Sequence, residues 1–224
     1  MKPRVQIDTL LMILAIFFTA VMYSLPKIYL APPIIQNIFV FFGYIMIIKG
    51  TMLRMSARGH KKAFSQKSTS LVTTGPYKVV RNPMYLGSFL IGAGFVFILW
   101  PWWGVPLFSW IFYKRFKRQI AYEEEILSRT FGSKYTAYRH LTPRVFPTVL
   151  SLGNVHMRDI FNVKEAFSTQ EKLGLISWPA LALTLEYFKK LYLYQHVNLA
   201  EILAVFCLSI VVFMAGFITL YYVK

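Results

Sequence analysis

The residues that most clearly suggest a chemical role are three consecutive carboxylates, Glu123, Glu124 and Glu125. They are one third of the nine acidic residues in the chain. Such a run usually forms a solvated, salt-bridged helix face. In a helix, Glu125 would pair with Arg129 four residues later. Glu123 and Glu124 have no Lys or Arg three or four residues away on either side, so they need a cation from elsewhere. A sulfonium ligand would supply that charge, and its ribose hydroxyls would donate to a carboxylate.

Three glycines in an apolar segment, Gly87, Gly92 and Gly94, allow two interpretations. Small residues let helices pack closely in lipid, or let a backbone approach a ligand. The segment carries no G-x-G-x-x-G fingerprint of a dinucleotide-binding turn. Close helix packing is therefore the favoured interpretation.

The other reactive side chains indicate neither a metal site nor a nucleophile. Cys207 is the only cysteine, so neither an intrachain disulfide nor a cysteine metal site can form. No serine nucleophile elbow is present. The histidines lack metal-ligand spacing and are expected at the surface or a membrane interface; they are His60, His140, His156 and His196.

The elements that must position these residues are membrane helices. Hydrophobic residues make up 56% of the 224 residues and charged residues only 15%, against about 25% charged in an ordinary soluble domain. The apolar blocks are long enough to cross a hydrocarbon core, which takes roughly 20 helical residues. The sequence predicts an all-α, polytopic membrane helical bundle of about six transmembrane helices, over 9–25, 33–53, 86–103, 104–113, 173–188 and 199–223.

The basic residues set the expected orientation. Lys and Arg number 25, and the formal net charge is +16. Because they lie in loops beside apolar blocks, we interpret them as cytoplasmic charge facing membrane lipids, and we expect no nucleic-acid partner. With both termini cytoplasmic, only Lys27, Lys189 and Lys190 lie outside. Segments 54–85 and 114–172 then share one face, where a common site could form.

Several short motifs follow one another in a characteristic order. They are Thr74-Gly75-Pro76-Tyr77, Arg81-Asn82-Pro83-Met84-Tyr85-Leu86-Gly87, an apolar hairpin, Glu123-Glu124-x-x-Leu127, Phe131-Gly132-x-x-Tyr135-x-x-Tyr138 and Pro143-Arg144. This series, over about 56–147, resembles the isoprenylcysteine carboxyl methyltransferase and phospholipid methyltransferase superfamily of integral membrane enzymes. The ordered series is far more specific than any one motif.

The resemblance implies transfer of a methyl group from S-adenosylmethionine to a lipophilic, membrane-embedded acceptor, either a phospholipid amine or an isoprenylcysteine-like group. We expect an N-terminal transmembrane hairpin (1–55), a methyltransferase core (56–147) and a C-terminal extension with two further transmembrane helices (148–224). The resemblance places the cofactor site on the cytoplasmic side, lined by Thr69, Ser70, Leu71, Val72, Tyr77, Asn82, Pro83, Met84, Tyr85 and Glu123.

Two departures from the family pattern bear on the site. Asn82 stands where a histidine is usual, and it still offers a donor and an acceptor. Gln119 stands four residues before Glu123, where the isoprenylcysteine enzymes place an arginine that holds the substrate carboxylate. Arg118 is adjacent but points about 100° away around a helix. We name Gln119 and Arg118 as substrate-binding residues and expect the acceptor not to be a free prenylcysteine carboxylate.

Two other functions fit the same residues. A membrane reductase of the sterol type would bind NADPH, although Glu123 would repel a dinucleotide phosphate. A non-catalytic membrane partner protein could retain the cofactor motifs without turnover. Binding of labelled S-adenosylmethionine distinguishes the reductase, and methylation of a lipid extract distinguishes the inert protein.

Overall fold

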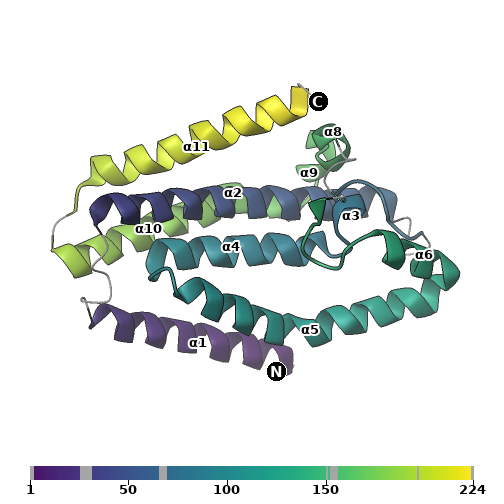
Figure 1. Ribbon diagram of the computed structural model, residues 1–224, viewed down its shortest axis with the longest axis horizontal. Helices are drawn as coiled ribbons and strands as arrows, with labels where there is room; N and C mark the ends of the chain where they lie inside the picture. The colour runs from purple at the N-terminus through teal and green to yellow at the C-terminus, as the bar shows by residue number, and fades with distance from the viewer. Residues whose placement is uncertain are drawn as a thin grey trace.

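Long helices lying side by side form the body of the computed structural model, which describes residues 3–25, 32–65, 70–149, 151, 156–195 and 197–222. The described part is helical without strands, so the all-α prediction is confirmed. Short helices gather at one end (Figure 1). The long helices are α1 (Pro3–Tyr23), α2 (Pro33–Phe64), α4 (Pro83–Leu99), α5 (Gly104–Phe131), α10 (Gly174–Tyr194) and α11 (Leu199–Tyr222). The short ones are α3 (Pro76–Val79), α6 (Ser133–Leu141), α8 (Met157–Ile160), α9 (Val163–Ala166) and the 3-10 helix η3 (Gln170–Leu173).

The closest helix packing is between α2 and α4, and it depends on glycine. A Cβ atom on Gly50 would lie 2.6 Å from the Gly87 carbonyl oxygen, and one on Gly87 would lie 2.7 Å from the Gly50 oxygen. Gly43 and Gly94 repeat this reciprocal contact seven residues along each helix, at 2.8 and 2.6 Å. The two backbones therefore touch at two heights. Gly92 faces an aromatic ring of α5, so all three glycines of α4 serve packing, as favoured.

The helix α2 is longer than its apolar block. It was expected to stop at Arg54, yet it continues to Phe64. The added segment contains good helix formers, and its inner face is covered, since Met55 and Ala57 are fully buried. The end of the apolar block showed where the chain becomes polar, but the helix continues beyond that point.

The helix α10 also extends further than expected, to Tyr194 instead of residue 188. Lys189, expected in an outside loop, lies within it and is only 5% exposed. Its Nζ donates to the Ile98 carbonyl at 2.7 Å. One turn earlier, the buried Glu186 accepts a 2.6 Å hydrogen bond from the Tyr44 hydroxyl. These polar contacts fasten α10 to α2 and α4, which is why the helix does not end at its lysines.

The first helix packs on the turn between α4 and α5 (Figure 1). Phe18 lies edge-on to Trp100 and Trp103, with ring centroids 4.8 and 6.2 Å away. The Trp100 indole N–H donates to the Thr19 hydroxyl at 2.9 Å. These contacts join α1 to the α4–α5 turn, and the hairpin predicted for residues 1–55 stays a prediction.

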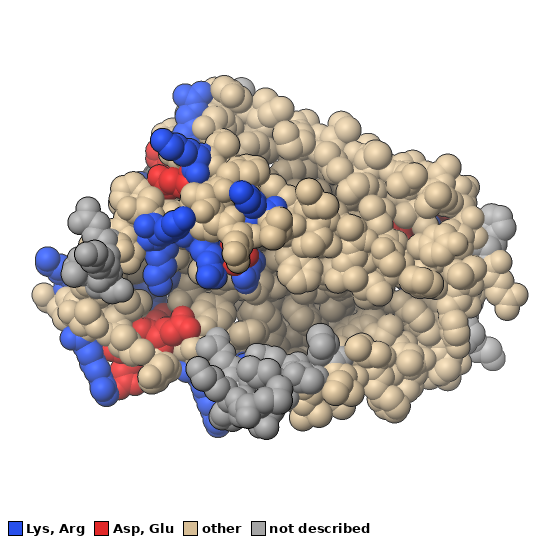
Figure 2. Space-filling model, turned by 180° about the vertical axis from the view of Figure 1, so that it is seen from behind, with Lys and Arg blue, Asp and Glu red and all other residues tan. Residues whose placement is uncertain are grey.

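Membrane character is concentrated in two helices. Ile34–Phe64 and Leu199–Tyr222 are long and apolar enough to cross a membrane, whereas the apolar segments Ile13–Tyr23 and Pro83–Leu99 are shorter. The six-span topology and its orientation stay predictions. On the face in Figure 2, Lys, Arg and acidic residues gather towards one end, and most of the remaining body carries no charge. Many large hydrophobic side chains are also exposed, among them Ile16, Ile176 and Val211. Soluble proteins rarely expose so large an apolar surface, so this distribution is typical of a membrane protein.

Candidate functional site

Two polar segments distant in sequence meet at the end where the short helices gather. The Arg81 N–H donates to the Pro143 carbonyl at 2.8 Å, and the Asn82 N–H donates to the Arg144 carbonyl at 3.1 Å. From α6, the Tyr138 hydroxyl donates to a backbone carbonyl of α3 at 2.6 Å. The turn before α4 and the chain after α5 therefore form one structure, as expected for a shared site.

Glu123 is the distinctive group of this site. Its Oε1 accepts hydrogen bonds from the Tyr85 hydroxyl and the Gln119 side-chain amide, both at 2.7 Å. Within the described ranges, its second oxygen has no hydrogen-bond partner and no Lys or Arg nitrogen lies within 4.0 Å of it. Glu123 is half-buried, so its negative charge is held in place without a matching cation.

The two neighbouring glutamates are neutralised in different ways. Glu124, whose side chain is 12% exposed, lies 3.0 Å from the Arg144 guanidinium and 3.4 Å from that of Arg81. Its cations thus come from elsewhere in the chain, as expected. Glu125 is exposed and pairs with Arg129 one turn later, which confirms the helical prediction. Glu123 is left as the carboxylate able to serve a ligand.

The Tyr77 hydroxyl is close enough to Arg58 and to Glu123 to feel both charges. Burial raises the pKa of the Tyr77 hydroxyl above its ordinary value, Arg58 lowers it, and Glu123 raises it. The hydroxyl donates to the backbone of α2, to the Ala57 carbonyl at 3.3 Å. The sequence did not reveal Arg58 as a site residue, because α2 was expected to end before it. The structure brings Tyr77, Tyr85 and Glu123 together.

Three predicted site residues at the start of α4 have structural contacts. The Asn82 side-chain amide donates to Glu124 at 3.2 Å and to the Arg144 carbonyl at 3.0 Å. Pro83 is buried as the first residue of the helix, and Met84 is half-buried. Asn82 therefore holds the turn with its amide, and its part in cofactor binding stays a prediction.

The stretch before α3 is only partly visible. The Ser70 hydroxyl donates to the Phe64 carbonyl at 2.7 Å, and Leu71 and Val72 are half-buried. Thr69 lies outside the described residues. This stretch leads to Tyr77, and its part in cofactor binding stays a prediction.

His60 was expected at the surface or at a membrane interface, but it is buried inside the protein. The residue is 8% exposed. Its Nδ1 lies 2.8 Å from the Glu165 carboxylate and its Nε2 lies 2.8 Å from the Thr74 hydroxyl. The reason is the extension of α2, which places His60 on a helix face covered by α9. Two other histidines are exposed, as expected, His140 and His156, and His196 lies outside the described residues.

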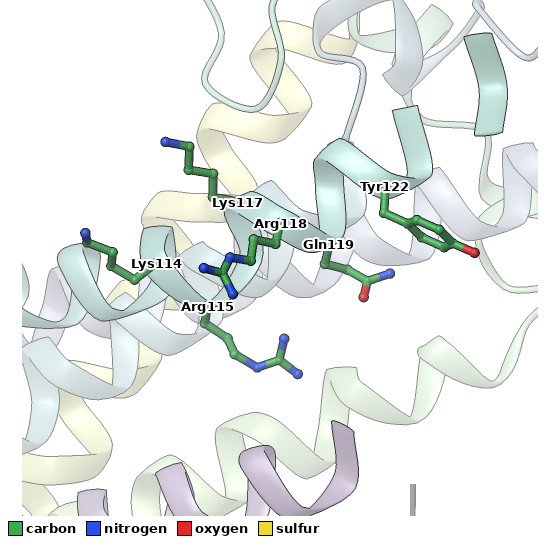
Figure 3. A pocket seen from close by; sticks show the side chains of 6 residues that line it. All are labelled: Lys114, Arg115, Lys117, Arg118, Gln119 and Tyr122. Atoms are coloured by element: carbon green, nitrogen blue, oxygen red, sulfur yellow. The ribbon is translucent and has the colours of Figure 1, made fainter. Parts of the chain in front are cut away.

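A basic cleft of about 590 Å³ lies along α5, next to Glu123. Its described lining residues are Lys114, Arg115, Lys117, Arg118, Gln119 and Tyr122. In Figure 3, Arg115 and Gln119 project from the same side of α5. Gln119 both lines the cleft and donates to Glu123. Arg118 lies in the cleft as a potential anion ligand, whereas the Gln119 amide is engaged by the carboxylate. None of these six residues is acidic, so the cleft suits an anionic group.

Comparison with known proteins links these features to a family. A family model described as phospholipid methyltransferase matches residues 37–134. The chain is 36% identical to a protein-S-isoprenylcysteine O-methyltransferase of Schizosaccharomyces pombe over 37% of its own length and 35% of that protein. It is 31% identical to protein-S-isoprenylcysteine O-methyltransferase B of Arabidopsis thaliana, over 48% of its own length and 59% of that protein. It is also 33% identical to the nickel-cobalt-cadmium resistance protein NccN of Alcaligenes xylosoxydans xylosoxydans, over 37% of its own length and 38% of that protein.

These matches cover less than two thirds of each relative's length. No solved structure matches the chain. The family match at 37–134 includes the turn before α4 and the three glutamates of α5, which carry the ordered motifs. Over these residues the chain is therefore similar to the isoprenylcysteine carboxyl methyltransferases and phospholipid methyltransferases.

Proposed function

We propose that the protein is an integral membrane methyltransferase that uses S-adenosylmethionine. The observation that carries this proposal is the half-buried Glu123 carboxylate, which has two donors on one oxygen and no cation among the described residues. A partly buried carboxylate without a cation is costly. A ligand with a positive charge and hydroxyl donors would compensate it, and S-adenosylmethionine has both. When bound, it supplies a methyl group on a positively charged sulfur.

The residues around Glu123 would hold and orient this ligand. Tyr85 and Gln119 fix the position of the Glu123 carboxylate through their hydrogen bonds. The Tyr85 ring packs edge-on against an aromatic ring of α5, with centroids 5.3 Å apart, so the hydroxyl is itself well placed. Arg58, whose guanidinium also lies 3.4 Å from the Glu171 carboxylate, would offer a further donor to the carboxylate of the ligand's amino-acid part. Positioning two bound molecules can lower a barrier by several kcal/mol without a covalent intermediate.

The acceptor that we propose is a phospholipid amine. Arg115 and Arg118 of the basic cleft would bind its phosphate, which places the head group next to Glu123. The Gln119 amide donates to Glu123, so it does not replace the arginine that holds a prenylcysteine carboxylate in the isoprenylcysteine enzymes. A prenylcysteine carboxylate would therefore lack a cation at the position that these enzymes use, and the cations of the cleft come instead from other positions of α5.

The test uses the purified protein in lipid nanodiscs. Saturable binding of labelled S-adenosylmethionine, and no binding of NADPH, is the expected result, and the reverse would favour the reductase. Mass spectrometry then follows methylation of phosphatidylethanolamine and of a farnesylcysteine analogue, and we expect a product from the phospholipid only. Binding without any methylated product in a lipid extract would support a non-catalytic partner. Farnesylcysteine methylation that survives Gln119→Ala but disappears in Arg118→Ala would overturn the phospholipid assignment.

A further inference from the structure

We infer that the C-terminal extension completes the proposed cofactor site through a relay of three side chains, Glu165, His60 and Thr74. In this relay, Glu165 orients the His60 ring, and the ring holds the Thr74 hydroxyl at the start of the loop that carries Tyr77. The inference rests on the proposed function, because it assigns the relay to cofactor binding. His60 and Glu165 are positioning residues, and Glu165 lies beyond the family match at 37–134.

The Glu165 carboxylate fixes the direction of the first hydrogen bond, and the second direction follows for a neutral ring. The Glu165 oxygen lies 2.8 Å from Nδ1, and the side chains of His60 and Glu165 are only 10% and 19% exposed. A carboxylate can only accept, so Nδ1 carries the proton. In a neutral ring Nε2 is then an acceptor, and the Thr74 hydroxyl donates to it at 2.8 Å. A carboxylate that orients a histidine in this way selects the ring tautomer.

The hydroxyl of Thr74 is a suitable anchor for Tyr77 because α3 begins two residues after Thr74. The Thr74 carbonyl accepts from the Tyr77 N–H at 3.2 Å. The next residue, Gly75, has a φ of 61°, and a Cβ there would lie 2.8 Å from the His60 ring. The other ring contact is Phe64, with centroids 4.3 Å apart. The ring therefore supports both the backbone and the first side chain of the loop, and any tilt of the ring displaces Tyr77.

The extension is fastened to α2 independently of the relay. The backbone of Glu165 packs directly on Gly59, where a Cβ would clash with the Glu165 carbonyl. The Ser56 hydroxyl donates to the Ile160 carbonyl, and the Lys62 ammonium donates to the Ser168 carbonyl at 3.0 Å. Because the backbone on either side is held, the Glu165 carboxylate is presented to His60 from a fixed point.

The test compares Thr74→Val, which removes only the hydroxyl, with Thr74→Ser, which retains it. Thr74→Val and Glu165→Ala should each weaken S-adenosylmethionine binding about 2-fold to 12-fold, as expected for the loss of one net hydrogen bond. Thr74→Ser should bind like the unmodified protein. If Glu165 acts through His60, the variant that combines Thr74→Val with Glu165→Ala should bind S-adenosylmethionine no more weakly than the weaker-binding of the two single variants. Lys62→Ala is the matched control, since it removes a contact of the extension without touching the loop.

A second measurement needs no ligand. Amide hydrogen exchange at residues 74–78 should be faster in Thr74→Val and Glu165→Ala than in the unmodified protein, and unchanged in Lys62→Ala. Failure of the unmodified protein to bind S-adenosylmethionine would contradict the proposed function and, with it, the role of the relay in cofactor binding. Normal binding by the unmodified protein and by both relay variants, or unchanged exchange in those variants, would overturn the relay alone.

Discussion

Replacing each of the three adjacent glutamates of α5 with glutamine should give three different phenotypes. Glu123→Gln should weaken S-adenosylmethionine binding strongly. The glutamine oxygen can still accept the hydrogen bonds from Tyr85 and Gln119, which lie at 2.7 Å, so the substitution removes mainly the charge. Hydrogen bonds to charged groups contribute about 1.5 to 3 kcal/mol, so affinity should fall roughly 10-fold to 150-fold. The melting temperature should change little.

The neighbouring substitutions serve as controls of opposite kinds. Glu124→Gln removes the charge facing Arg81 and Arg144 in a site where the Glu124 side chain is 12% exposed, so the free energy of unfolding should fall by about 1.5 to 3 kcal/mol. Glu125→Gln disrupts an exposed pair with Arg129 and should alter neither property.

Calorimetric titration and thermal denaturation in the same detergent measure both quantities for all three variants. Equal, small losses of affinity in Glu123→Gln and Glu125→Gln would indicate that Glu123, like Glu125, belongs to a solvated helix face. A fall in melting temperature at Glu123→Gln as large as at Glu124→Gln would show that Glu123 has a structural partner. Either result would refute the assignment of Glu123 to a ligand.

Other features give separate predictions. Gly87→Ala places a Cβ 2.7 Å from a backbone oxygen of α2 and should lower the free energy of unfolding by about 1 to 3 kcal/mol. Gly216→Ala, where a Cβ would have nothing within 4 Å, should not lower it. Thermal denaturation measures both variants. Burial raises the pKa of the Tyr138 hydroxyl, so deprotonation opposes folding and the free energy of unfolding should fall above about pH 10. In Tyr138→Phe the fall in the free energy of unfolding should be smaller, as measured by chemical denaturation at each pH. Cytoplasmic reporters should be active after Arg158 and inactive after Trp102; activity at Trp102 would contradict the predicted third and fourth spans.

Helical spacing predicted the local part of the site. It identified the Glu125 pair with Arg129 and showed that Glu123 and Glu124 cannot be neutralised within their own helix. It could not separate the latter two, because Arg81 and Arg144 approach Glu124 only after the turn before α4 pairs with the chain after α6. Spacing within one helix carries no information about such long-range pairing.

The end of α2 and the role of His60 could not be predicted for a related reason. Local polarity indicated a stop at Arg54, but the following turns are stabilised by burial against the C-terminal extension. Met55 packs in one cluster with Phe161 and Ala166 of that extension. A rule based on neighbouring residues does not include a partner this distant in sequence, so both the helix end and the buried histidine were missed.

The two reciprocal glycine contacts between α2 and α4 determine which helices can move. Glycines that face the opposing backbone at two heights fix the register, since sliding by one residue, about 1.5 Å, would bring larger side chains into the crossing. Tyr85 lies two residues from one contact and Arg54 four residues from its partner, so their relative height is constant. By contrast, α5 meets α4 through ring pairs such as Phe89 with Phe112, which can shear past one another. A lipid entering sideways to the proposed site would therefore shift α5 along α4 at these rings, and the α2–α4 pair would stay fixed.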